Sequence, residues 1–104
     1  MEKWINLYLE FLKKEYLVGK ESIENTRKDI LKNPSGEYGI AYIEDDYGRD
    51  LQVNINFKER VITYYIDDEL VKKEDYSEEE FDHLLADLDY DTFMETFYEF
   101  DDMD

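Results

Sequence analysis

The chain has 104 residues, a net charge of −17, 42% hydrophobic and 16% aromatic residues, and no cysteine. This length supports one domain with a single modest core, and the aromatic content argues against a disordered acidic chain. The lack of cysteine excludes disulfides, thiolate catalysis and cysteine-ligated zinc, and no apolar run is long enough for a membrane span or a signal peptide. We therefore expect one soluble, cytoplasmic domain over residues 1–104.

Two helices are expected at the N-terminus. In EKWINLYLEFLKKEY (2–16) apolar residues recur at helical intervals and form a broad stripe, and Gly19 is expected to end this helix or to follow it. Ser22 is expected to cap a second helix over SIENTRKDILKN (22–33), which Pro34 and Gly36 then break.

A meander of antiparallel strands follows. Residues 38–43, LQVNINF (51–57) and VITYYID (61–67) are expected to be strands, and EDDYGRD (44–50) is expected to join the first two as a hairpin loop. LQVNINF alternates strictly between apolar and polar residues, which predicts one buried and one wet face. Asp67, Asp68 and Glu69 are expected to turn the chain into a short fourth strand, LVKKEDY (70–76), so the sheet has three or four strands.

Two further helices are expected at the C-terminus. Ser77 and Glu80 have the spacing of a capping box, and a buried stripe follows at Phe81, Leu84, Leu85 and Leu88. Asp91 is expected to cap a last helix whose inner side carries Phe93, Met94, Phe97, Tyr98 and Phe100. The predicted fold class is α+β, with the two C-terminal helices packed on one face of the sheet.

The stretch DLDYD (87–91) has aspartates at alternate positions, as at the start of a calcium loop. Asp87, Asp89 and Asp91 fit loop positions 1, 3 and 5, but Thr92 stands where a Gly is required and Tyr98 where a bidentate Glu is required. We expect no metal and no cofactor.

Catalytic chemistry is not indicated by the remaining residues. His83 is the single histidine, lies off the apolar stripe of its helix and has no nearby nucleophile, so it is expected to be an exposed helix residue. With 29 acids in the chain, some pair of carboxylates will always have a glycosidase-like separation, so such a pair carries no information. The expectation is a protein that is not an enzyme.

The distribution of charge is the most informative feature. Residues 1–60 hold 12 acids and 10 bases, whereas residues 61–104 hold 17 acids and 2 bases. Such a surface disfavours direct binding to nucleic acid or to anionic membranes, and favours the basic groove of a nucleic-acid-binding protein. The candidate partner-binding residues are Asp67, Asp68, Glu69, Glu78, Glu79, Asp82, Asp87, Asp89 and Asp91.

In element order and charge, including the acidic segment EEEFDHLLADL (78–88), the chain resembles small acidic inhibitors of phages and mobile elements, such as anti-CRISPR proteins and uracil-DNA glycosylase inhibitors. Segment 22–33 is an addition to that pattern. The resemblance implies a non-catalytic DNA mimic, most simply of the anti-CRISPR type, that occupies the DNA-binding groove of its target.

Two alternatives stay open at this point. An immunity protein that neutralises a basic nuclease toxin would use the same charge complementarity. A generic interaction domain would carry the charge for solubility alone, and replacing its acids by amides would leave function intact. The sequence predicts that changing Asp87, Asp89 and Asp91 to Asn slows association with little loss of fold. It identifies neither the partner nor the oligomeric state.

Overall fold

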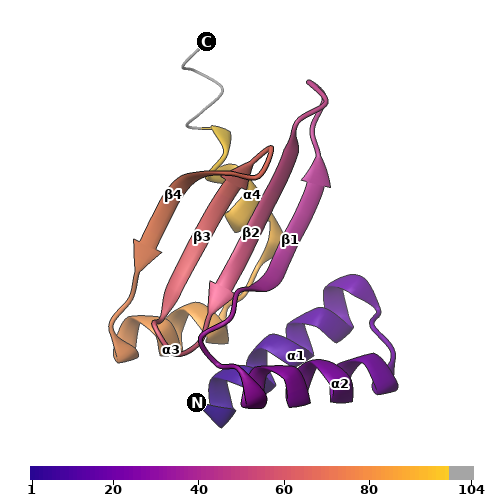
Figure 1. The fold of residues 1–104 in the computed structure, drawn as a ribbon, viewed down its shortest axis with the longest axis vertical. Coiled ribbons are helices and arrows are strands. Elements are labelled where there is room, and N and C mark those ends of the chain that lie inside the picture. The colour runs from indigo at the N-terminus through magenta and orange to yellow at the C-terminus, as the bar shows by residue number, and fades with distance from the viewer. Residues whose placement is uncertain (99–104) are drawn as a thin grey trace.

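The structure is a computed structural model that describes residues 1–98, so the predicted core residue Phe100 lies outside the described part. Within residues 1–98 the chain forms four helices and one antiparallel sheet of four strands in the order β1-β2-β3-β4 (Figure 1). The predicted α+β class is confirmed, and the sheet includes the fourth strand.

The N-terminal helices are α1 (Glu2–Tyr16) and α2 (Lys20–Lys32). The predicted cap of α2 at Ser22 is wrong, because the helix begins earlier: Gly19 is extended at φ −70° and ψ 159°, and its carbonyl accepts the first helical bond, from the Ile23 N–H. Ser22 therefore lies in the first turn. Leu17, at φ 52°, is the left-handed residue that ends α1, and Gly19 follows the helix, which is one of the two predicted possibilities.

The strands are β1 (Tyr38–Glu44), β2 (Asp50–Asn56), β3 (Val61–Ile66) and β4 (Glu69–Asp75). In the register of β2 with β3, Val53 lies opposite Tyr64 and Ile55 opposite Ile62, and all four side chains are buried. The apolar set of LQVNINF thus faces the core as predicted, because side chains alternate between the two faces of a strand.

The C-terminal helices are α3 (Glu78–Ala86) and α4 (Tyr90–Glu95). The predicted capping box is confirmed: the Glu80 N–H donates to the Ser77 hydroxyl, and the Glu80 carboxylate accepts from the Ser77 N–H at 3.0 Å. α4 lies behind the sheet, whereas α1, α2 and α3 gather at the end of the sheet where β2 turns into β3 (Figure 1). Phe81 of α3 is fully buried there and makes edge-to-face contacts with Trp4 and Phe57.

The face of the sheet that points away from the apolar core is polar. The Gln52 amide donates to the Asn54 side chain on β2, and the Glu37 carboxylate accepts from the hydroxyls of Thr63 and Tyr65 on β3, both at 2.8 Å. These side chains satisfy one another's hydrogen bonds. The face is polar as predicted, but Asn54 and Thr63 on it are buried rather than exposed to water.

Candidate functional site

The fold separates charge between two regions. The helical pair 1–32 carries 6 acids and 7 bases, whereas residues 33–98 carry 19 acids and 5 bases. Since α1 and α2 lie together at one end of the molecule (Figure 1), the sheet and the C-terminal helices present the negative charge. The candidate surface is therefore formed by the turns that connect the strands and by α3.

The first acidic group lies at the end of the sheet where β1 turns into β2 and β3 turns into β4 (Figure 1). The two turns are joined: the Asp67 N–H donates to the Asp50 carbonyl, and the Asp67 carboxylate accepts from the Asp50 N–H, each at 2.9 Å. We call the acids of these turns and the adjoining strand ends the turn cluster: Glu44, Asp45, Asp46, Asp50, Asp67, Asp68 and Glu69.

The field of the turn cluster acts on a tyrosine of β1. The pKa of the Tyr42 hydroxyl is raised, mainly by the charge of Asp50, with smaller contributions from its slight burial, from its hydrogen bond to Asp50 and from the charges of Asp68 and Glu44. Carboxylates from both turns therefore lie close enough to influence one group.

The second acidic group surrounds the start of α3 at the opposite end of β4. We call it the α3 cluster: Glu74, Asp75, Glu78, Glu79 and Asp82. Glu80 is counted with the capping box instead, because its carboxylate is held by Ser77, whose backbone N–H and side chain lower the pKa of Glu80. Glu74 and Asp82 also have partners: Glu74 contacts Lys72 and Tyr76, and Asp82 contacts Trp4. Glu78 and Glu79 occupy the first turn of the helix, where the helix dipole stabilises negative charge.

Strand β4 sets the distance between the two clusters. Its seven residues rise by about 3.3 Å each, which places the clusters about 20 Å apart. Lys72 and Lys73 lie between them, and the Lys72 ammonium is 3.3 Å from the Glu74 carboxylate. The predicted residues 67–69 and 78–82 therefore form two separate groups at the two ends of β4 rather than a single patch.

The connection between α3 and α4 contains the DLDYD stretch. The helix cap predicted at Asp91 is wrong: Asp89 is the cap, since its carboxylate accepts from the Asp91 N–H at 3.1 Å and from the Thr92 hydroxyl at 3.3 Å. The helix begins at Tyr90, two residues earlier than a cap at Asp91 would place it. Asp87 is the C-terminal boundary residue of α3.

Three of the nine predicted partner-binding residues also hold the fold together. Asp67 joins the two turns, Asp82 accepts a hydrogen bond from the Trp4 indole, and Asp89 caps α4. Within residues 1–98 the other six carboxylates make no hydrogen bond or ion pair: Asp68, Glu69, Glu78, Glu79, Asp87 and Asp91. Their charge is available to a partner.

Sequence reasoning left the acids of 44–50 out of the candidate site. Glu44, Asp46 and Asp50 join Asp67 and Asp68 because alternate turns of a meander lie at the same end of the sheet. The predicted element order already contained this signal.

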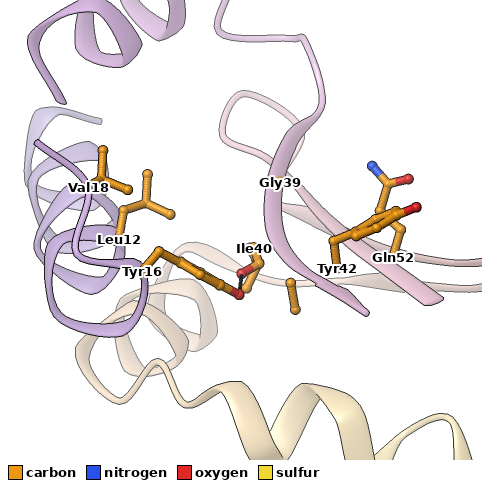
Figure 2. A pocket seen from close by; sticks show the side chains of 8 residues that line it. Leu12, Tyr16, Val18, Gly39, Ile40, Tyr42 and Gln52 are labelled. Atoms are coloured by element: carbon orange, nitrogen blue, oxygen red, sulfur yellow. Dashed lines mark hydrogen bonds between the residues drawn. The ribbon is translucent and has the colours of Figure 1, made fainter. Parts of the chain in front are cut away.

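A groove of about 410 Å³ runs beside β1 and is lined mainly by apolar atoms of α1, β1 and β2 (Figure 2). The Tyr16 hydroxyl donates to the Ile40 carbonyl, and the Tyr8 hydroxyl donates to the Gly39 carbonyl at 2.6 Å. These two hydrogen bonds hold α1 against the backbone of β1. The groove holds no carboxylate or base and is not the candidate site.

Other site chemistries find no support in the described part of the chain. Among residues 1–98, no three His, Asp or Glu side chains gather in a way that could hold a metal ion. His83 is exposed on α3, as predicted. None of the helices in residues 1–98 has the length and apolar character needed to cross a membrane. No protein-family model, curated protein or solved structure matches the chain.

Proposed function

We propose that this protein is a non-catalytic cytoplasmic inhibitor that binds the basic nucleic-acid-binding groove of a target protein, with its carboxylates in the place of phosphates. The observation that carries the proposal is the pair of acidic clusters at the two ends of β4, about 20 Å apart by the rise of the strand. If the acids served solubility alone, there would be no reason for them to be concentrated away from the nearly neutral α1–α2 pair.

The spacing suits a groove that binds a duplex. Successive phosphates of one DNA strand are about 3.4 Å apart along the axis, so about 20 Å corresponds to roughly six phosphate steps. A basic groove concentrates field lines over such a length and attracts an acidic partner from a distance. Charge complementarity of this kind mainly accelerates association and excludes nucleic acid from the same groove.

The nearly neutral α1–α2 pair affects the orientation in which the protein approaches a basic target. The α1–α2 pair holds 6 acids and 7 bases, so a basic target does not attract it. The electrostatic field therefore favours approach with the β4 side leading. The resemblance to anti-CRISPR proteins makes a CRISPR effector nuclease the first target class to test. A nuclease toxin, the target of an immunity protein, has the same basic groove and is the second.

The experiment is affinity capture from a bacterial lysate, with the proteins identified by mass spectrometry. The test variant carries Asp68→Asn, Glu69→Gln, Glu78→Gln and Glu79→Gln, which removes four charges that have no partner within residues 1–98. The control carries Glu10→Gln, Glu15→Gln, Glu21→Gln and Glu24→Gln, which removes four exposed charges from α1 and α2.

The proposal predicts that the wild type and the control capture the same basic nucleic-acid enzyme, and that the test variant associates with it about tenfold more slowly. A CRISPR effector supports the anti-CRISPR type and a toxin nuclease the immunity type. Equal capture by all three proteins, or a partner that binds no nucleic acid, would overturn the proposal.

A further inference from the structure

A cleft of about 350 Å³ lies between the β1–β2 turn and α4, next to the turn cluster. Its walls combine three tyrosines with four carboxylates, a mixture that the apolar groove beside β1 lacks. These residues are Tyr47, Tyr90 and Tyr98, with Glu44, Asp45, Asp46 and Asp91. The volume lies in the range of small-ligand pockets and is large enough to receive a side chain from a partner.

The wall of the cleft already holds one guanidinium. Arg49 Nη2 lies 2.6 Å from Asp45 Oδ2, and the Arg49 Nε–H donates to the same oxygen at 2.7 Å. The guanidinium carbon lies 5.3 Å from the centroid of the Tyr47 ring. A carboxylate and a tyrosine face from this turn thus bind an arginine head group by ion pairing and cation–π contact together.

The binding of Arg49 also fixes Asp45. Burial acts to raise the pKa of Asp45, but hydrogen bonds from the Arg49 backbone and side chain and from the Tyr47 backbone outweigh it, so the pKa is lowered. The Asp45 carboxylate is therefore already occupied by Arg49. Glu44, Asp46 and Asp91 line the same cleft and make no ion pair within residues 1–98.

Two of the tyrosines are unusually open for large aromatic side chains: Tyr47 is 78% exposed and Tyr98 66% exposed. Tyrosines near the centre of protein interfaces are frequent anchors, and arginine is the cation that best combines stacking on a ring with a carboxylate pair. Lysine supplies the charge but lacks the flat face.

We infer that this cleft is the socket for one arginine side chain of the partner, stacked on tyrosine and paired with Asp46 or Asp91. The inference rests on the proposed function for the identity of the partner, a protein whose phosphate-binding groove is rich in arginine. The preference of the cleft for a guanidinium can be measured without that partner.

The experiment titrates N-acetyl-arginine amide into the full chain and follows the tyrosine ring signals by NMR, with N-acetyl-lysine amide and the neutral N-acetyl-citrulline amide in parallel. Expected is a saturable shift of the Tyr47, Tyr90 and Tyr98 signals, strongest with arginine and absent with citrulline. Asp46→Asn with Asp91→Asn should weaken arginine binding by about threefold or more, while Asp75→Asn at the far end of β4 should not. Equal shifts with all three probes, or shifts centred on Tyr42 and Tyr65 instead, would overturn the inference.

The titration and the capture experiment together allow the inferred arginine socket and the proposed function to be tested independently. Saturable arginine binding at the cleft, combined with capture of no basic protein, would support the socket and remove the proposed function. A basic partner that binds the Asp46→Asn, Asp91→Asn variant as tightly as the wild type would support the function and remove the socket.

Discussion

Trp4 on α1 donates its indole N–H to the carboxylate of Asp82 on α3, a hydrogen bond between residues 78 positions apart in the chain. The Trp4 ring also packs edge-to-face on Phe81 at 4.9 Å between centroids. The contact joins α1 to α3, the helix that carries Glu78, Glu79 and Asp82 of the α3 cluster. Asp82 is therefore expected to contribute mainly to folding.

Replacing Asp82 by Ala tests this assignment. The loss of a half-buried, charge-assisted acceptor should lower the free energy of unfolding by about 1–2 kcal/mol, because the indole N–H is left without a partner. Glu79→Ala, at an exposed position of the same helix, should change it by less than about 0.5 kcal/mol. Urea unfolding of both variants gives the comparison. Similar values for the two would show that the Trp4 contact adds nothing.

The Asp67-Asp68 turn allows charge to be removed while the fold is strengthened. Both residues are left-handed, at φ 50° and 66°, which is the conformation that Asn-Gly adopts most readily in two-residue hairpin turns. Asp67→Asn with Asp68→Gly should raise the free energy of unfolding by about 0.5–1 kcal/mol, since Asn can still accept from the Asp50 N–H.

The same double variant should bind the partner more slowly, because it lacks two charges of the turn cluster. Loss of binding by a more stable protein cannot be assigned to unfolding. Thermal unfolding and association kinetics on one preparation provide the measurement. A variant that is more stable and binds as fast as the wild type would exclude this turn from the interface.

Leu17 offers a stability test remote from the acidic clusters. It ends α1 in the left-handed region and is 86% exposed, so a branched side chain takes an unfavourable backbone conformation and gains little burial. Leu17→Gly should raise the free energy of unfolding by about 0.5–1 kcal/mol after the entropy of glycine is deducted. Leu17→Ala is the control and should give no comparable gain, because alanine keeps the strain.

Tyr16 predicts a loss of stability at high pH. Burial above all, and then the charges of Tyr90 and Glu15, raise the pKa of Tyr16 to about 12. In the unfolded chain tyrosine titrates near 10, so the folded state holds the proton more tightly. The contribution of Tyr16 is therefore complete below about pH 10 and is lost as the pH rises to about 12.

The measurement is the urea midpoint at a series of pH values. Tyr16→Phe should be less stable than the wild type at neutral pH, since the Ile40 carbonyl loses its donor, but its midpoint should fall less steeply between about pH 10 and 12. Burial also raises the pKa of Tyr8 and Tyr76, so both proteins retain some slope. Identical slopes would contradict the role given to Tyr16.

Local patterns predicted the elements because their causes lie within a few residues. The alternation of LQVNINF and the spacing of Ser77 and Glu80 each act over one strand or one helical turn. The caps at Gly19 and Asp89 were missed because another residue with a capping side chain follows each of them within three positions, Ser22 after Gly19 and Asp91 after Asp89. The Trp4–Asp82 bond depends on how α1 packs on α3, which no local pattern contains.

The candidate site was predictable only in part for the same reason. The acids of 67–69 and 78–82 stand out by charge alone, but their separation depends on β4 running the length of the sheet. Asp46 and Asp50 belong to the turn cluster because neighbouring strands pair, which brings the two turns together. The cleft exists because α4 returns to the β1–β2 turn.

The most direct test of the proposed inhibitor function is competition by DNA for the purified partner. Binding of the wild type to the captured protein is measured at constant ionic strength, with increasing concentrations of duplex DNA. DNA is expected to displace the protein completely, and the protein is expected to displace DNA in the reverse titration, because both occupy one groove. A ternary complex, in which the partner holds DNA and this protein together, would contradict it.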